Sequence, residues 1–298
     1  MKDPKWRSLI VLAAAGLACG AAAAKGPAGV SSHVRRVGQD AQWAEIQGLL
    51  SKCVGVYASP GRLYPNFTPD GPFMGNGDMH VALLGGPHRQ VFHISKSDMW
   101  TDDRNICPIT FGGVTISPDA NTDITAFRQE HDILHAEVRA TSAAGFKTKS
   151  FVANENVLLT ELWTDGSVGI PMHVDVWARA DRPQYPAKAG VDGAARILWV
   201  TRETCGGPKA RWVTRAALAV AIEGVSITTR TDGLGKNTAS FTLKPGKKAT
   251  LYTVLAGGKD ATTHLKDAKA KVVTLNAPKA AALSSTSAVF GSANAVDS

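Results

Sequence analysis

The chain has few cysteines and no long apolar run after its first residues. It contains four cysteines among 298 residues, and their spacing is not that of a metal knuckle. Beyond residue 24 three remain, Cys53, Cys107 and Cys205, which allow one internal disulfide at most, and the sequence does not fix the pair. Because no second apolar segment follows residues 9–17, we expect a soluble protein without membrane contact.

Signatures of nucleophilic catalysis and of nucleic-acid binding are also missing. There is no Gly-x-Ser-x-Gly motif, and no cysteine stands in a recognisable catalytic context. The 33 basic residues are scattered among 25 acidic ones, which favours a solvated basic surface over a nucleic-acid interface. We therefore expect no nucleic-acid partner, no cofactor and no metal.

The first residues have the pattern of a secretory signal peptide. A positive head (Lys2, Lys5 and Arg7) precedes the apolar residues 9–17, and residues 22–24 offer a small-residue cleavage site. The alternative, a membrane anchor, is disfavoured because the apolar stretch is too short to span a bilayer. The pattern predicts cleavage after residue 24 and a secreted or periplasmic protein. Cleavage removes three basic residues and one acidic residue, so the net charge of the mature protein would be +6, compared with +8 for the whole chain.

The rest of the chain is dominated by alternating apolar and polar residues. In residues 170–178 the apolar side chains recur at every second position, and residues 133–140 show the same period, which is typical of a sheet with one buried face. Further runs of this kind cover 89–95, 108–116, 145–153, 157–164, 195–202, 211–221, 224–230, 237–244 and 248–256. About a dozen strands without intervening helices predict a mainly β fold, a large antiparallel two-sheet β-sandwich.

Helical spacing is confined to the two flanks of this region. We expect a linker with a short helix over residues 25–59, in which residues 40–52 carry apolar side chains at helical spacing. The sandwich domain is expected over 60–258 and a linker helix over 259–275. Residues 276–298 are small, polar and without period, which predicts a disordered tail.

The stretch GPFMGNGDMHVALLGG, residues 71–86, is the richest in glycine. A phosphate-binding loop would follow a strand and open a helix; this loop precedes a strand, and no Lys-Ser/Thr pair follows it. We interpret it as a turn at the edge of the sandwich, in which Gly75 and Gly77 supply positive φ. Asn76 and Asp78 then either cap the turn by side-chain hydrogen bonds or approach a sugar or a domain interface.

This stretch, together with HRQVFHISKSDMWTDDR, ITFGGVTI and residues 127–164, resembles the N-terminal β-sandwich of glycoside hydrolase family 95. That family contains α-L-fucosidases and α-L-galactosidases. The shared pattern is Pro72, the Gly-Asn-Gly core at 75–77, two short strands, and a hydrophilic segment that ends at Trp100. The resemblance covers about residues 60 to 275. It departs from the family at two places. At residues 78–80 the family usually carries a basic and a small residue, and at residues 95–98 it typically carries an Asn-Glu pair.

The resemblance implies a domain that packs against a helical (α/α)6 barrel, which carries the catalytic groups of that family. The barrel has no counterpart in residues 276–298, so we expect this chain to be non-catalytic, with a glycan as its partner. The alternative is a secreted carbohydrate-binding module that acts alone. In both cases the implied contact residues include Asn76 and Asp78.

Three further candidates come from the residues themselves. Asp98, Asp102 and Asp103 with Trp100 form the densest acidic and aromatic cluster, which is either a sugar site or a solvated loop. Trp177 shares a strand face with polar residues and is the best exposed aromatic candidate; the alternative is that it fills the core. His131 and His135, four residues apart in one strand, would lie too far apart to share a metal ion.

Overall fold

The computed structural model describes residues 31–64, 68–101, 108–179, 185–193, 196–204, 211–232 and 235–276. The signal peptide, nearly all of the predicted tail, Asp102, Asp103, Cys107 and Cys205 lie outside these residues, whereas Cys53 has a free, exposed thiol. The chain divides into two compact units, residues 1–48 and 49–298. The described part of the first lies in helix α1, which spans Ser31–Leu50 and begins nine residues before the expected start at 40. No described helix has the length and apolarity to cross a membrane.

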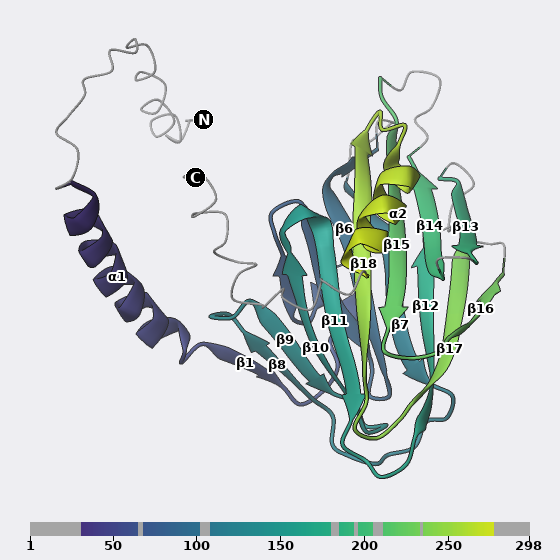
Figure 1. Cartoon of the computed structure of the whole chain (residues 1–298), viewed down its shortest axis with the longest axis horizontal. Coiled ribbons are helices and arrows are strands. Elements are labelled where there is room, and N and C mark those ends of the chain that lie inside the picture. The colour runs from purple at the N-terminus through teal and green to yellow at the C-terminus, as the bar shows by residue number, and fades with distance from the viewer. Residues whose placement is uncertain are drawn as a thin grey trace, which may run out of the picture. The chain divides into compact units, whose positions relative to one another are not determined.

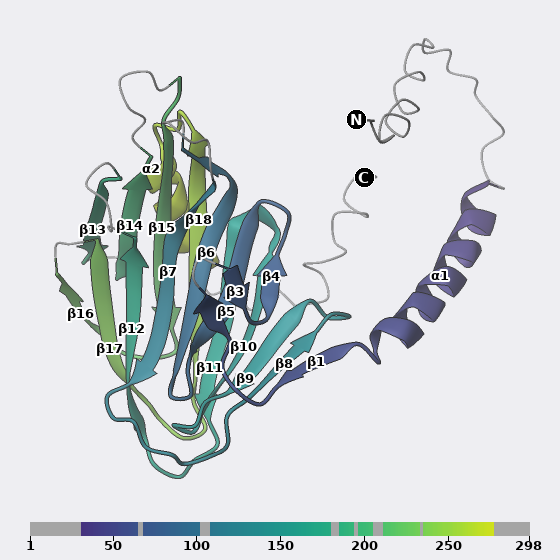
Figure 2. The ribbon, with the colours of Figure 1, turned by 180° about the vertical axis from the view of Figure 1, so that it is seen from behind.

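The second unit is built on two large antiparallel sheets, which confirms the predicted mainly β sandwich (Figures 1 and 2). One sheet has nine strands in the order β1 (Val54–Tyr57), β8 (Arg128–Asp132), β9 (Glu137–Thr141), β10 (Phe146–Ala153), β11 (Val157–Thr164), β18 (Lys248–Lys259), β15 (Thr214–Glu223), β14 (Ile197–Glu203) and β13 (Ala187–Asp192).

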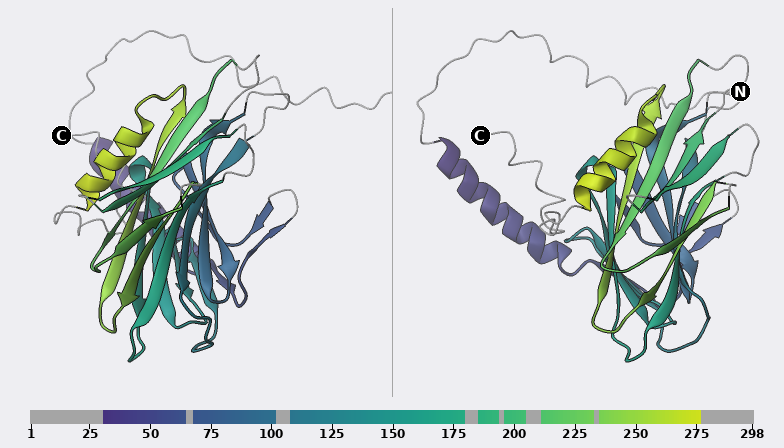
Figure 3. Two further views of the ribbon diagram at one scale, coloured as in Figure 1. Left: turned by 90° about the vertical axis from the view of Figure 1, so that its right-hand side faces the viewer. Right: turned by 45° about the vertical axis from the view of Figure 1, so that its right-hand side comes forward.

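The other sheet has seven strands, and a short ribbon accompanies it. Their order is β16 (Thr228–Thr231), β17 (Lys236–Leu243), β12 (Ile170–Ala178), β7 (Pro108–Pro118), β6 (Arg89–Trp100), β5 (Met79–Gly86) and β4 (Phe73–Gly75). The ribbon pairs β2 (Arg62–Tyr64) with β3 (Thr68–Asp70) and packs against β5. Helix α2 (His264–Leu275) lies on the nine-stranded sheet, on the side away from the seven-stranded one (Figure 3).

The alternating pattern determines which side chains fill the core. Met172, Val174 and Val176 of β12 are buried between the sheets, and the odd-numbered residues of this strand point outward. Phe92, Phe111 and Phe146 are the largest fully buried side chains. A smaller cluster forms under α2, whose Ala268 and Val272 cover the outer face of the nine-stranded sheet. Removal of this apolar surface from water is the main force that holds the layers together.

The strand predicted over residues 133–140 is wrong in its first half. These residues form a turn at 133–136 between β8 and β9, followed by the start of β9. The carboxylate of Asp132 accepts a hydrogen bond from the backbone N–H of His135 at 3.1 Å, and Ala136 takes a positive φ of 51°. This local side-chain bond reverses the chain, so Leu134 and Ala136 do not share a sheet face with Val138.

Candidate functional site

The glycine-rich stretch is a turn between β4 and β5, as predicted. The side-chain oxygen of Asn76 accepts hydrogen bonds from the backbone N–H groups of Asp78 (3.1 Å) and Met79 (2.8 Å). Gly77 has the expected positive φ of 92°. The same expectation is wrong for Gly75, whose φ is not positive; a Cβ there would lie 2.8 Å from the carbonyl oxygen of Met79. A glycine is therefore needed at position 75 because the backbone of Met79 passes too close for a side chain.

The side chain of Asn76 also reaches the opposite sheet. Its Nδ2 donates to the carbonyl oxygen of Ala153 (2.9 Å) and to Oδ1 of Asn156 (3.1 Å). Asn156 lies in η1 (Asn154–Asn156), the short turn that links β10 to β11, where its φ is 59°. Its Nδ2 in turn donates to Oδ2 of Asp78 at 2.7 Å. Asn76 therefore both caps its own turn and bridges the two sheets.

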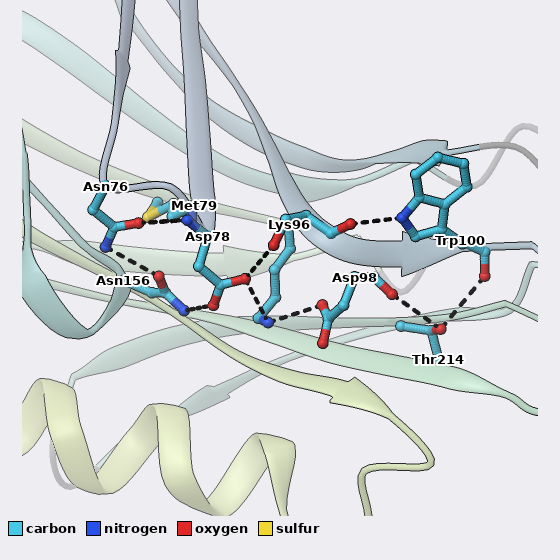
Figure 4. Close-up of polar contacts among 9 residues, drawn as sticks. Asn76, Asp78, Met79, Lys96, Asp98, Trp100, Asn156 and Thr214 are labelled. Atoms are coloured by element: carbon cyan, nitrogen blue, oxygen red, sulfur yellow. Dashed lines mark hydrogen bonds and ion pairs between the residues drawn. The ribbon is translucent and has the colours of Figure 1, made fainter. Parts of the chain in front are cut away.

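Lys96 is at the centre of this arrangement. The inward-facing row of β6 runs Phe92, Ile94, Lys96, and the lysine is only 8% exposed. Its Nζ donates to Oδ1 of Asp78 at 2.9 Å and to Oδ1 of Asp98 at 2.8 Å. These residues, with Asn76, Asn156 and Trp100, are called the Lys96 cluster below (Figure 4).

The contacts of the cluster stabilise the ionised forms of its members. Burial alone would raise the pKa of Asp78, but hydrogen bonds from Asn156, Ser97 and Lys96 outweigh it and hold the pKa below its ordinary value. Burial would likewise lower the pKa of Lys96, yet its bonds to the two carboxylates hold that pKa above the ordinary value. At neutral pH Asp78 is therefore a carboxylate and Lys96 an ammonium.

Thr214 of β15 and Gly258 of β18 lie on the other side of the cluster. The hydroxyl of Thr214 lies 3.4 Å from the carbonyl oxygens of both Asp98 and Trp100, to which it donates. A Cβ on Gly258 would lie 2.4 Å from Oδ2 of Asp98. Gly258 thus leaves the space in which the carboxylate of Asp98 sits.

The indole of Trp100 lies at the edge of the cluster and is 39% exposed. Its Nε1 donates to the carbonyl oxygen of Ser97 at 2.6 Å, which fixes the orientation of the ring (Figure 4). The side chains of Asp78 and Asp98 are also exposed, by 41% and 43%. The cluster therefore contains an exposed aromatic ring and two accessible carboxylates, each held in a fixed orientation by hydrogen bonds.

Four of the five predicted contact residues, Asn76, Asp78, Asp98 and Trp100, thus meet at one end of the sandwich. Trp177 does not join them, because it lies on the outer face of the seven-stranded sheet, where its Nε1 donates to the hydroxyl of Thr115. The sequence interpretation missed Lys96 and Asn156. A lysine in the apolar row of an alternating strand was a readable signal for the first, whereas nothing local distinguishes Asn156.

The arrangement suits hydrogen bonding to hydroxyl groups better than acid catalysis. The two Oδ1 atoms that bind Lys96 are less than about 6 Å apart, since both lie within 2.9 Å of one nitrogen. Retaining glycosidases place their two carboxyl groups about 5–5.5 Å apart, but one of the two must donate a proton. In this cluster an ammonium lies between the carboxylates, and Asp78 is held ionised.

A second group of titratable residues occupies the hairpin of β8 and β9. Ligand atoms of Asp132, His135 and Glu137 lie within 4.8 Å of one another. The argument that separated His131 from His135 along one strand does not apply, because His135 lies in the turn between β8 and β9. Arg139 and Lys149 already contact the carboxylate of Glu137, and His135 contacts that of Asp132 at 2.9 Å. The group is an ion-pair network, in which a metal ion would have to displace two cationic side chains.

A cavity of about 500 Å³ lies at the opposite end of the sandwich from the Lys96 cluster. It is formed by the loops that follow β7 and β11, and by the turn before β10. Ile124 and Val168 contribute apolar walls, and Lys147 and Asp165 form an ion pair beside them. No residue predicted as a contact lies in this cavity.

Comparison with known proteins gives distant structural matches only. No family model matches the chain, and no curated protein matches it. Among solved structures it is similar to a protein described as a kojibiose phosphorylase from the human microbiome (10% identity, TM-score 0.44, 78% of this chain and 38% of that one). It is also similar to the family GH92 alpha-mannosidase from Bacteroides thetaiotaomicron, at 10% identity and TM-score 0.41, over 78% and 35%.

A second structure of that alpha-mannosidase, in complex with mannoimidazole, matches with a TM-score of 0.39 at 10% identity, over 78% of this chain and 34% of that one. The chain therefore spans little more than a third of the length of the structures it matches. By their names two of these three structures are of a family 92 glycoside hydrolase, and none is of family 95.

Proposed function

We propose that this chain is a non-catalytic β-sandwich module of exported carbohydrate-processing proteins, and that the Lys96 cluster contacts the glycan. The observation that carries the proposal is the presence, in one cluster, of the exposed Trp100 indole and of two exposed carboxylates fixed by Lys96. Pyranose rings present C–H groups that pack on an aromatic face and hydroxyl groups that donate to carboxylates. A glycan chain can therefore contact the indole and the carboxylates through different groups.

The same contacts support a binding role over a catalytic one. A glycosidase acid needs a raised pKa to be protonated near neutral pH, and the pKa of Asp78 is held low. Lys96 also occupies the space between the carboxylates, where the glycosidic oxygen would have to lie. The cluster can orient a sugar without cleaving it.

The finer points of the proposal rest on the resemblance to family 95. They are a preference for fucosyl or galactosyl glycans, a secreted or periplasmic location, and a position in which this edge packs against a helical barrel domain. In such an assembly Asn76, Asp78 and Trp100 would form one wall of the active site. A second candidate function, a carbohydrate-binding module that acts alone, is favoured by the exposure of Trp100 in the isolated chain.

A glycan array and a hydrolysis assay on the purified chain test the proposal together. We expect binding to fucosylated or galactosylated glycans, its loss in Trp100→Ala, and no release of sugar from aryl fucosides or galactosides. Trp163→Ala is the matched control, because Trp163 is a partly exposed tryptophan on the outer face of the other sheet. Measurable hydrolysis, or binding that Trp100→Ala leaves unchanged, would contradict the proposal.

A further inference from the structure

Strand β1 forms a free edge of the nine-stranded sheet. It pairs with β8 on one side only, in a register that runs from Val54↔Asp132 to Tyr57↔Gln129, and Figures 1 and 2 show it as the outermost strand of its sheet. Among the described residues, none forms a hydrogen bond with the backbone on the outer side of β1. Such an edge presents N–H and C=O groups at the spacing that another extended strand needs.

This edge lacks the features that protect other sheet edges from pairing. Its sequence, Val-Gly-Val-Tyr, contains no charge and no proline, which are the usual protection of an edge strand. The edge strands β13 and β16 carry the charged residues Lys188, Asp192 and Arg230, and the edge strand β4 packs against β10. Among the described edges of the two large sheets, β1 is therefore the one that is open to a second strand.

The side chains of β1 favour an apolar strand as the neighbour. Val54 and Val56 lie on one face of the strand and are 41% and 52% exposed. β-Branched side chains stabilise a strand pair when they lie opposite each other, whereas in a single chain both valines contact water. The occupant of this edge must therefore be an extended, uncharged segment that has a free edge of its own. Every copy of this chain presents such a segment.

We propose that two copies of this chain form a two-fold symmetric dimer, in which the β1 strands pair antiparallel and join the two nine-stranded sheets. A two-fold interface uses the same patch on both copies, so one contact satisfies both free edges. It also removes the open apolar edge on which larger aggregates would otherwise grow. The inference does not depend on the function proposed for the Lys96 cluster, because no residue of β1 belongs to that cluster.

The geometry of an antiparallel pair determines the register of the dimer. Successive residues of a strand point their backbone N–H and C=O groups to opposite sides, so every second residue of β1 faces the partner. Opposite residues are then both odd-numbered or both even-numbered, which excludes the pairing of Gly55 with Val56 and places one residue on the two-fold axis. With Gly55 on the axis, Val54 of each copy lies opposite Val56 of the other, and the four valines form one patch. With Val56 on the axis, Val54 would face Ala58, which lies outside the strand. The dimer therefore has Gly55 on its axis.

Sedimentation velocity of the purified chain over a series of micromolar concentrations tests the dimer. We expect a concentration-dependent dimer whose dissociation constant rises at least about tenfold in Val56→Lys, because this substitution places a charge in both cross-strand valine pairs. Val273→Lys is the matched control, since Val273 is 51% exposed on α2, and it should leave the constant unchanged. The thermal unfolding midpoint of each variant shows that it is folded. A chain that stays monomeric, or a dimer that Val56→Lys does not weaken, would overturn the inference.

A cysteine cross-link tests the register. In a Cys53→Ser background, Gly55→Cys should form a disulfide between two copies on mild oxidation, because residues directly opposite each other have Cα atoms about 4.5–5.5 Å apart, which a disulfide can span. The position has room for a side chain, since the nearest atoms to a Cβ there lie at 3.5 Å. The exposed thiol of the unmodified Cys53 is the control. In this register the two Cys53 residues are offset by four positions, about 13 Å, which is too far for a disulfide.

Mass spectrometry of the cross-linked peptides identifies the cysteines that have reacted. We expect covalent dimers through residue 55 in Gly55→Cys and none through Cys53 in the unmodified chain. Covalent dimers linked through Cys53, or the absence of a cross-link in Gly55→Cys, would contradict this register and overturn the proposed dimer.

Discussion

The carboxylate of Asp78 and the side-chain amide of Asn156 are joined by a hydrogen bond of 2.7 Å that connects the two sheets at one end of the sandwich. Asp78 precedes β5 of the seven-stranded sheet, and Asn156 precedes β11 of the nine-stranded sheet. Because Asp78 also binds Lys96, the position of the site is coupled to the packing of the layers. Substitutions here are therefore expected to affect both stability and binding.

Lys96→Met should destabilise the fold by roughly 2 kcal/mol, the range of hydrogen bonds to charged groups. It removes the ammonium from between two carboxylates that then repel each other. Urea denaturation at pH 7 measures the change. Lys248→Met is the control, because its ion pair with Glu161 is exposed and should be worth less than about 1 kcal/mol. An equal loss of unfolding free energy in both variants would contradict a stabilising role for the buried Lys96 ion pairs.

Asp78→Asn should remove a pH dependence from the stability of the protein. The pKa of Asp78 is lower in the folded state than its ordinary value of 3.8, so the carboxylate contributes stability that is fully present above that value. This contribution is lost as the pH falls through the folded pKa. The difference in unfolding free energy between the protein and the variant should therefore be constant from pH 5 to 7 and shrink below pH 4. A difference that grows below pH 4 would contradict the assignment.

Gly258→Ala should displace Asp98 without removing a charge. A Cβ at this position would lie 2.4 Å from Oδ2 of Asp98, so the carboxylate must rotate away, and the φ of 157° adds backbone strain. We expect glycan affinity to fall about as much as in Asp98→Ala, which isothermal titration calorimetry can compare. Gly246→Ala is the control for strain, since Gly246 has a φ of 67° and no atom within 4 Å of its Cβ. Unchanged affinity in Gly258→Ala would show that Asp98 takes no part in binding.

Tyr252 should titrate far above the ordinary value for a tyrosine. Burial, followed by the hydrogen bond to Glu223 and that residue's negative charge, raises its pKa to about 12. The phenol thus contributes stability that is present below the ordinary pKa of 10.0 and is lost as the pH rises through about 12. Absorbance at 295 nm should show a tyrosine that ionises near pH 12, and that ionises at a lower pH in Glu223→Gln. Ionisation of all four tyrosines near pH 10 would contradict this.

Alternation along the strands made most of the fold predictable from the sequence. Residues 170–178 coincide with β12, in which one face fills the apolar core and the polar face lies outside it. Residues 157–164 coincide with β11, which is buried on both faces in its first half, because Val157 and Leu159 lie in the cluster under α2. The turn at 133–136 was not predictable from alternation, because the apolar period continues through it. The turn is stabilised by the carboxylate of Asp132, which accepts a hydrogen bond from the backbone N–H of His135.

Only the part of the site that comes from residues 76–100 was predictable from the sequence. Asn76, Asp78, Asp98 and Trp100 stood out because they are polar or aromatic residues close together in sequence around a turn and a strand end. Asn156 and Gly258 join them from the opposite sheet, through register and packing that no local pattern encodes. Lys96 occupies a position at which the alternation of β6 predicts an apolar, inward-facing residue. This pattern predicts a buried charge, but it does not identify the two carboxylates that bind it.

The central claim is that the Lys96 cluster binds a glycan and does not cleave it. Incubation of the purified chain with fucosylated and galactosylated oligosaccharides, followed by calorimetry for binding and chromatography for released sugar, tests both halves in one sample. We predict heat of binding that Trp100→Ala abolishes and Trp163→Ala retains, with no sugar released. Released sugar, or binding that Trp100→Ala leaves intact, would contradict the claim.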